Sequence, residues 1–216
     1  MNTGHPQIDD APQALILGSD EVGFGAWAGP LVVAAVAVPR DWTDPRVKDS
    51  KKLTERQREA AYGAFKDSYP SALVIVSAEV IDQKGVWEAL REAHQDAIRL
   101  VLDQCLVQPL IVVDGNLDIP DAVALPKADQ LVPAVSLASI LAKVTRDKIM
   151  LDLDQKYPGY AFAKSKGYGT QAHQAGLERL GPCPEHRRSY EPVARLAPRE
   201  ATDARTIWDY LFEEEP

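Results

Sequence analysis

Hydrophobic residues in this chain fall into short continuous runs in its first half. Four runs have the length and composition of buried strands: ALILGSD (14–20), LVVAAVAV (31–38), the β-branched stretch 72–80 and LIVVD (110–114). Gly23, Gly25, Gly29 and Pro30 lie between the first two runs, where they predict a turn region.

Helical spacing is clearest between residues 136 and 155, where Leu137, Ile140, Leu141 and Val144 recur at intervals of three and four positions. Further helices are predicted from Thr54 to about Ser68 and over 87–106, 171–180 and 201–212. Because strands come first and then alternate with helices, the order predicts an α/β fold, a mixed sheet flanked by helices. A small helical element is expected at the C-terminal end.

The composition is that of an ordinary globular chain. Its 216 residues are 45% hydrophobic and 26% charged, which excludes disorder as the main state and suffices for one domain with a small appendage. Cys105 and Cys183, the only cysteines, make neither a disulfide framework nor zinc-ligand spacing. The longest apolar run, 26–39, is too short to cross a bilayer, and residues 1–12 lack signal-peptide character. We expect a cytoplasmic protein.

The formal net charge of −8 does not exclude a nucleic-acid ligand, because the negative charge is concentrated at the ends of the chain. Residues 200–216 carry −5 and residues 1–17 carry −2, which leaves −1 for the segment 18–199. Global charge affects solubility and long-range steering rather than what one cleft can bind. The body of the protein therefore remains a candidate for a ligand that carries phosphate.

Acidic residues end two of the predicted strands. Asp20 and Glu21 follow the first run, and Asp114 closes the fourth. Strands lying side by side would bring these acids together at the sheet edge, where like charges repel or recruit a hard cation such as Mg²⁺. Asp129 and, more weakly, Asp147 are further candidates. An aspartate at a strand end also forms turns, and one before a helix also caps it. The residues alone leave both interpretations open: an acidic cation site with phosphoryl chemistry, or turn and cap residues.

Five sequence blocks resemble the ribonuclease HII family, and they occur in the family's order. The blocks are GSDEVGFGAWAGPLVVAAV (18–36), DSKKLT (49–54), VDGN (113–116), KADQLVPAVSLASILAKVTRD (127–147) and YPGYAFAKSKGYGTQAHQAGLERLGPCPEHRRSYEPV (157–193). The resemblance implies a ribonuclease H-like core over 14–157, a flexible N-terminus over 1–13, and a C-terminal helical extension with an acidic tail over 158–216. It implies a monomer that hydrolyses the RNA strand of RNA–DNA hybrids and incises 5′ to ribonucleotides embedded in duplex DNA, leaving 5′-phosphate and 3′-hydroxyl ends.

The resemblance also implies functional residues. The family's four metal-binding acids match Asp20, Glu21, Asp114 and Asp129, which would hold two Mg²⁺ or Mn²⁺ ions. No histidine is needed; His186 alone is considered as a phosphate or packing contact. Substrate contacts are expected from Gly23, Phe24, Gly25, Lys51, Lys52, Lys143, Tyr168 and Arg187, with Tyr168 resembling the family's junction-sensing tyrosine and Lys166 and Arg188 as further backbone contacts.

One position departs from the family's pattern. The usual turn after the acidic pair is Gly-Arg-Gly, whereas this chain has Phe24 in the middle. Phenylalanine supplies neither charge nor hydrogen-bond donors. An alternative is therefore a specificity like that of ribonuclease HIII, which favours long hybrids over single ribonucleotides. Other functions fit less well: a resolvase- or integrase-like nuclease, a catalytically silent hybrid-binding protein, or a small-molecule phosphotransferase, for which the chain has no glycine-rich phosphate loop.

Overall fold

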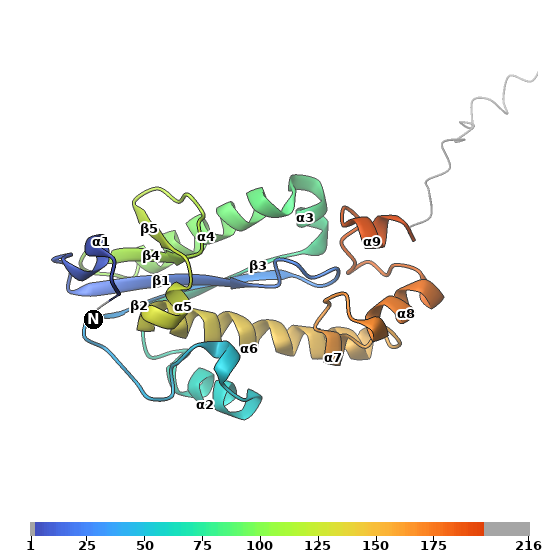
Figure 1. Cartoon of the computed structure of the whole chain (residues 1–216), viewed down its shortest axis with the longest axis horizontal. Coiled ribbons are helices and arrows are strands. Elements are labelled where there is room, and N and C mark those ends of the chain that lie inside the picture. Colours follow the sequence, from blue (N-terminus) through green and yellow to red (C-terminus); the bar gives the residue numbers. More distant parts are fainter. Residues whose placement is uncertain (1–2, 197–216) are drawn as a thin grey trace, which may run out of the picture.

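The computed structural model describes residues 3–196 and contains one five-stranded mixed sheet (Figure 1). Its strands are β1 (Leu15–Val22), β2 (Leu31–Pro39), β3 (Ser71–Val76), β4 (Leu110–Asp114) and β5 (Ala122–Leu125). Their order across the sheet is β3-β2-β1-β4-β5, with β1 antiparallel to β2, β2 antiparallel to β3, and β1 and β5 parallel to β4. The predicted mixed α/β fold is confirmed.

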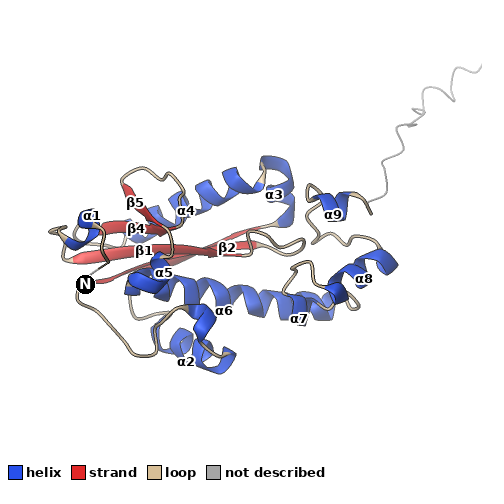
Figure 2. Ribbon diagram, in the orientation of Figure 1, coloured by secondary structure: helices blue, strands red, loops and turns tan. Residues whose placement is uncertain are grey.

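Helices cover both faces of the sheet (Figure 2). The larger ones are α2 (Glu55–Phe65), α3 (Ala78–Lys84), α4 (Val86–Leu102), α6 (Pro133–Lys156) and α8 (Gln171–Leu180). The short ones are α1 (Pro6–Asp9), η1 (Ser50–Lys52), α5 (Ala128–Leu131), α7 (Phe162–Ser165) and α9 (Glu191–Ala194). Helices α2 and α6 pack on one face and α3 and α4 on the other, so each face has its own hydrophobic core.

Alternate residues of β1 enter the two cores. Ile16 packs against the α6 side, and Leu17 packs against the α4 side. Gly18 lies directly under α6: a Cβ built there would be 2.3 Å from the backbone of Ala134 and Val135. The glycine thus lets the strand and the helix approach closely, two residues before the acidic end of β1.

The C-terminal elements pack against the end of α6 rather than on the sheet. Phe162, Leu177 and Val193, one each from α7, α8 and α9, form a third buried cluster with Met150 of α6. Trp27, in the loop between β1 and β2, packs against this cluster, so the C-terminal part is joined to the loop that follows the acids. The helix expected over 201–212 and the acidic tail lie outside the described residues.

Some local expectations need correction. The strand expected over 72–80 ends at Val76, because the Ser77 side chain accepts a hydrogen bond from Val80 N and caps helix α3. Strand β5 and helix α3 were not predicted. The N-terminal segment, expected to be flexible, contains α1, whose Ile8 is fully buried. Among the described residues, no helix has the length and apolar character needed to span a membrane.

Candidate active site

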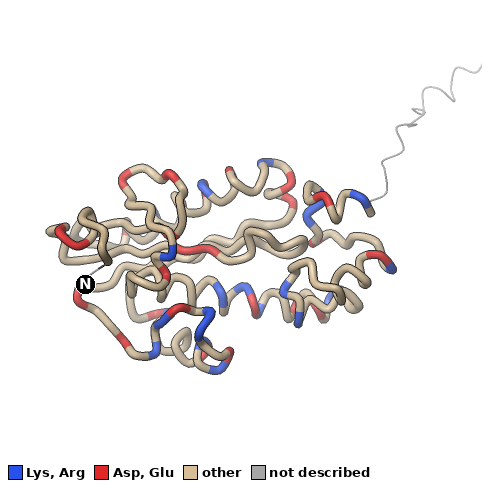
Figure 3. Tube along the Cα trace, in the orientation of Figure 1, with Lys and Arg blue, Asp and Glu red and all other residues tan. Residues whose placement is uncertain are grey.

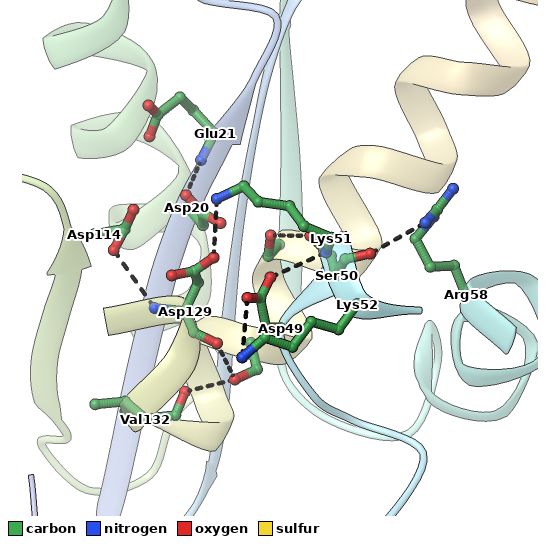
Figure 4. Close-up of polar contacts among 12 residues, drawn as sticks. Asp20, Glu21, Asp49, Ser50, Lys51, Lys52, Arg58, Asp114, Asp129 and Val132 are labelled. Atoms are coloured by element: carbon green, nitrogen blue, oxygen red, sulfur yellow. Dashed lines mark hydrogen bonds and ion pairs between the residues drawn. The ribbon is translucent and has the colours of Figure 1, made fainter. Parts of the chain in front are cut away.

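Strand pairing brings the predicted acids to one edge of the sheet. β1 and β4 are parallel, with Ser19 paired to Val113, so Asp20 and Asp114 come next on neighbouring strands. Glu21 follows Asp20 on β1, and α5 carries Asp129, whose backbone N–H donates to the Asp114 carboxylate at 3.4 Å (Figure 4). The structure therefore brings together four acids from three segments of the chain.

A cavity of about 310 Å³ opens beside three of these acids. Its walls carry both acidic and basic side chains; they are formed by Asp20, Glu21, Val22, Ser50, Lys51, Arg58, Asp114, Ser139, Lys143 and Tyr168. In Figure 3 the basic positions lie along α6 and around η1 and α2, next to the acidic end of β1. Such a cleft can hold a cation on one wall and a phosphate on the other.

Two of the four carboxylates, Asp20 and Asp129, are buried, while Glu21 and Asp114 are half-buried. Asp20 is 5% exposed and Asp129 is 1% exposed. Burial, followed by the negative charge of Glu21 and that of Asp114, raises the pKa of Asp20 well above its usual range. Burial and the charge of Asp129 raise the pKa of Asp114. A bound cation would relieve this repulsion.

The donor set fits a hard divalent ion, because every donor is a carboxylate oxygen. Within residues 3–196, however, no three acidic, histidine or cysteine side chains are already gathered around a point that could hold a metal ion. The four side chains would have to turn toward a common centre to ligate one. Lys51 supplies positive charge in the present arrangement, with its Nζ 3.2 Å from Asp129 Oδ2.

The segment around η1 places Lys51 in the cavity. Asp49 caps η1 by accepting from Lys51 N at 3.0 Å, and its carboxylate lies 3.7 Å from Lys52 Nζ. Lys52 therefore pairs beside the cavity instead of lining it. Arg58 Nη1 donates to Ser50 O at 3.1 Å, which ties η1 to α2. Arg58 is a cationic wall residue that the sequence analysis did not identify.

Helix α6 contributes Lys143 but not Asp147. Lys143 lines the cavity and its Nζ lies 2.7 Å from Asp147 Oδ1. Asp147 is absent from that lining and instead lines a different, smaller pocket together with α2 residues Glu55 and Arg58. The fifth candidate acid is therefore an ion-pair partner of Lys143 rather than a member of the acid cluster.

Two buried arginines hold the loop after β1 by its carbonyl groups. Arg146 donates from Nε to Pro30 O at 2.8 Å, from Nη2 to Ala28 O at 3.1 Å, and from Nη1 to Lys166 O at 2.7 Å. Arg187 donates to Gly29 O at 3.0 Å and to Phe24 O at 2.9 Å. Burial lowers the pKa of Arg146 to about 10.

The expected backbone-phosphate contact of Arg187 is therefore wrong for this arrangement: its side chain is fully buried, and its donors are engaged by the loop. The two glycines of the loop differ as well. Gly23 has φ +96° and lies under Arg146, where a Cβ would be 2.3 Å from Nε. Gly25 is exposed, with open space around the position of a Cβ. Only Gly25 leaves the backbone free for a close approach by a ligand.

His94 lies behind Glu21, a placement that the sequence did not indicate. Its imidazole is fully buried in α4, and Nε2 is 3.4 Å from Glu21 Oε2. Ser19 Oγ lies 3.0 Å from Ala34 O and 2.8 Å from His94 Nδ1, so the hydroxyl forms hydrogen bonds with both the carbonyl and the ring. The hydrogen bond to Ser19 fixes the ring orientation beside the carboxylate.

Tyr168 lies at the rim of the cavity and is 37% exposed. Its ring is 5.5 Å from the Arg146 guanidinium, and its carbonyl forms a hydrogen bond with His173, which in turn contacts His186. His173 Nδ1 donates to Tyr168 O at 2.9 Å, so its Nε2 accepts from His186 Nε2 at 3.0 Å. His186 Nδ1 then accepts from Cys183 N at 3.0 Å. His186 is thus a packing residue, buried beneath Tyr168.

This histidine pair predicts acid sensitivity. Burial and the neighbouring His173 lower the pKa of His186 to about 4, below the ordinary value of 6.5. Below pH 6.5 the unfolded chain binds this proton while the folded chain does not, so stability falls until pH 4. Between pH 6.5 and pH 4 we expect the Tm of His186→Gln to fall by a few degrees less than the Tm of the native chain. In a chain of this length, a change of about 1 kcal/mol in the free energy of unfolding shifts Tm by about 2–4 °C. Thermal melts at a series of pH values, with His5→Gln as control, test this; parallel pH profiles for native and His186→Gln would contradict it.

Comparisons with known proteins agree with this geometry. The sequence model of a family described as ribonuclease HII matches residues 17–193. The chain is 45% identical over 185 residues to a ribonuclease HII of Thermus thermophilus, covering 84% of this chain and 88% of that protein. The crystal structure of ribonuclease H2 from Pyrococcus horikoshii is similar, with TM-score 0.70 and 27% identity over 84% of this chain and 96% of that one. A structure of Bst-RNase HIII in complex with Mn²⁺ shares the fold, with TM-score 0.67 and 19% identity over 88% and 71% of the two chains.

Proposed function

The chain belongs to the ribonuclease HII family and is therefore a ribonuclease H, an endoribonuclease of RNA–DNA hybrids; from this premise we propose how it cuts its substrate and which residues do so. Two divalent cations, Mg²⁺ or Mn²⁺, are held by the acid cluster at the ends of β1 and β4 and on α5. The ligands are Asp20, Glu21, Asp114 and Asp129. The enzyme also incises 5′ to single ribonucleotides in duplex DNA, and the products carry 5′-phosphate and 3′-hydroxyl ends.

The observation that carries this proposal is the meeting of four acids at one sheet edge next to a basic wall. The raised pKa values of Asp20 and Asp114 support it, because carboxylates in such surroundings need positive charge nearby to ionise. The Mn²⁺ found with the similarly folded Bst-RNase HIII supports a hard cation as that charge. All four acids come from one chain, so we propose that a monomer suffices.

The chain's own residues have separate roles in binding the substrate. When bound, the cations supply Lewis acidity and a nucleophile derived from water. Lys51, Lys143 and Arg58 bind phosphates of the strand that is cut, because they line the same cavity as Asp20, Glu21 and Asp114. The open backbone at Gly25 approaches the ribose, whose 2′-hydroxyl distinguishes RNA from DNA. Tyr168 stacks at the rim, on the sugar beside the ribonucleotide.

A cleavage assay on two labelled duplexes tests the function directly. One duplex carries a single ribonucleotide in DNA and the other is a continuous RNA–DNA hybrid, each incubated with Mg²⁺ or Mn²⁺. We expect both to be cut, the first on the 5′ side of the ribonucleotide. Cleavage of the hybrid alone would contradict the proposed single-site incision and favour the alternative, a specificity like that of ribonuclease HIII. If neither is cut, the proposal fails.

Phe24 sets the ratio between the two substrates. Its side chain carries no charge or hydrogen-bond donor, unlike the arginine expected at this turn from the resemblance, and its ring packs on Trp87. We expect Phe24→Arg to raise kcat/KM for single-ribonucleotide incision about 5- to 20-fold relative to hybrid cleavage, the size of one added charge-assisted hydrogen bond. Steady-state kinetics on both duplexes measure this. The same substrate ratio for native and variant proteins would show that backbone amides alone make the contact.

Tyr168 is expected to matter most where RNA joins DNA. Tyr168→Ala should lower kcat/KM for the single ribonucleotide by about 10-fold or more but change hybrid cleavage much less, because loss of one stacked ring costs about 1–3 kcal/mol. Tyr168→Phe keeps the ring and should retain most of the activity. Equal losses on both substrates would show that the ring only packs.

A further inference from the structure

A second cavity, of about 260 Å³, lies on the other side of the acid cluster from Lys51. It shares Glu21 and Asp114 with the first cavity, and its remaining walls come from the loop after β1, from α4 and from the loop after β4. These walls are formed by Phe24, Trp87, Leu90, His94, Gly115, Asn116 and Leu117. We call it the aromatic pocket.

Two aromatic rings form the mouth of the aromatic pocket. The centroids of Phe24 and Trp87 are 4.6 Å apart, and their planes are inclined by 60°. Trp87 is nevertheless 63% exposed, although it stands at the start of a helix whose other apolar residues are largely buried. A tryptophan held in place by a neighbouring ring, with most of its surface open, offers a platform for a further ring.

The charge of the aromatic pocket selects what can enter. Among the described residues, its lining contains no lysine or arginine, whereas the first cavity contains Lys51, Arg58 and Lys143. Beyond the two shared acids, the aromatic pocket therefore offers a phosphate no positively charged side chain, and its walls favour an uncharged group. An uncharged heterocycle can stack on Trp87, and Asn116 offers an amide to its edge.

We propose that the aromatic pocket binds a nucleobase of the strand that is cut, within two nucleotides of the scissile phosphate, with Trp87 as the stacking residue. This inference rests on the proposed function. The two shared acids determine where the base lies relative to the scissile phosphate. When this phosphate lies over Glu21 and Asp114, its neighbouring phosphates enter the basic cavity. A base of the same strand can then enter the aromatic pocket. Trp87 and Phe24 thus become specificity-determining residues for the hybrid.

A set of hybrids that lack one base at a time in the cut strand tests this coupling. At one position near the cut, removal of the base should lower kcat/KM of the native enzyme about 5- to 20-fold, the effect of losing one base–aromatic stack. Trp87→Phe should show the same penalty. On the intact hybrid, the kcat/KM of Trp87→Ala should be about 5- to 20-fold below that of the native enzyme. Removal of the base at that position should then lower the kcat/KM of this variant no further. Leu100→Ala, an exposed apolar residue of the same helix, is the matched control.

Tryptophan emission gives a readout that does not depend on cleavage. Without divalent cations, the intact hybrid should quench the tryptophan fluorescence of the native protein more than that of Trp87→Phe. Both proteins retain the other tryptophans, so the difference in quenching reports on Trp87. A full base-removal penalty in Trp87→Ala, or equal quenching of both proteins, would overturn the proposal. Quenching that grows with protein concentration in the absence of hybrid would also overturn it, in favour of contact between two copies. A native protein that binds but does not cut the hybrid contradicts the proposed function instead, and the quenching comparison still decides the role of Trp87.

Discussion

Asp114→Asn is expected to lower kcat for hybrid cleavage by about 10³-fold or more, because metal stabilisation of transition-state charge is worth several kcal/mol. Asp114 is the last residue of β4, lies beside Asp20 on the neighbouring strand, and lines both cavities. The Kd for the hybrid should stay within about threefold of native, since phosphate contacts supply most of the affinity. Single-turnover cleavage and a binding titration on the same hybrid measure the two effects separately.

Metal-dependent stability gives the same prediction a second readout. Mg²⁺ or Mn²⁺ that binds only the folded chain should raise its Tm, and a concentration 100 times the Kd contributes about 2.7 kcal/mol. Asp114→Asn should lose most of this rise, whereas Asp103→Asn, an exposed residue at the end of α4, should keep it. Near-native cleavage by Asp114→Asn would refute the assigned acid cluster.

Arg146→Ala is expected to lower the free energy of unfolding by about 3 kcal/mol or more, because it leaves two buried carbonyl groups and one half-buried carbonyl group without this donor, at about 1–3 kcal/mol for each buried group. Two of the carbonyls belong to Ala28 and Pro30, in the loop that carries Phe24, and the third belongs to Lys166, which follows α7. Such a loss is a large share of the stability of an ordinary domain. Urea denaturation followed by circular dichroism measures it.

Arg146→Lys should lie between the native chain and Arg146→Ala, because a single ammonium group cannot reach three carbonyls in the way that a planar guanidinium does. Arg99→Ala is the matched control: this side chain is exposed on α4 and forms an ion pair with Asp96. Its change should stay within about 0.5 kcal/mol. If Arg146→Ala were as stable as Arg99→Ala, the arginine would not fasten the loop.

Three members of the acid cluster were within reach of sequence reasoning, because Asp20, Glu21 and Asp114 lie at the ends of apolar strands. LIVVD and ALILGSD each end on an acid, and parallel pairing of such strands brings their ends together. The mixed sheet and the long helix α6 followed from equally local patterns. Strand β5 gave no comparable signal, since its four residues are all half-buried at the edge of the sheet.

The supporting residues were out of reach because their roles depend on distant partners. Arginine is mostly exposed in proteins, so the sequence predicts no buried role for Arg146 and a phosphate contact for Arg187. Both side chains instead donate hydrogen bonds to carbonyl groups more than 100 residues away in the sequence. Trp87 begins the helix predicted over 87–106, and only the fold shows its ring exposed beside Phe24. His94 likewise meets Glu21 across 73 residues of sequence, and no local pattern announces that contact.

The parallel pairing of β1 with β4 has a consequence for the order in which the molecule assembles. The hairpin of β1 and β2 closes over a short loop, but the register between Ile16 and Leu110 encloses nearly the whole first half of the chain. Closing so long a loop costs conformational entropy before any contact compensates for it, and contacts of this kind slow folding. The carboxylates meet only when that step is complete. Helices can therefore form in a refolding chain well before it is able to cut, and nuclease activity marks the end of folding.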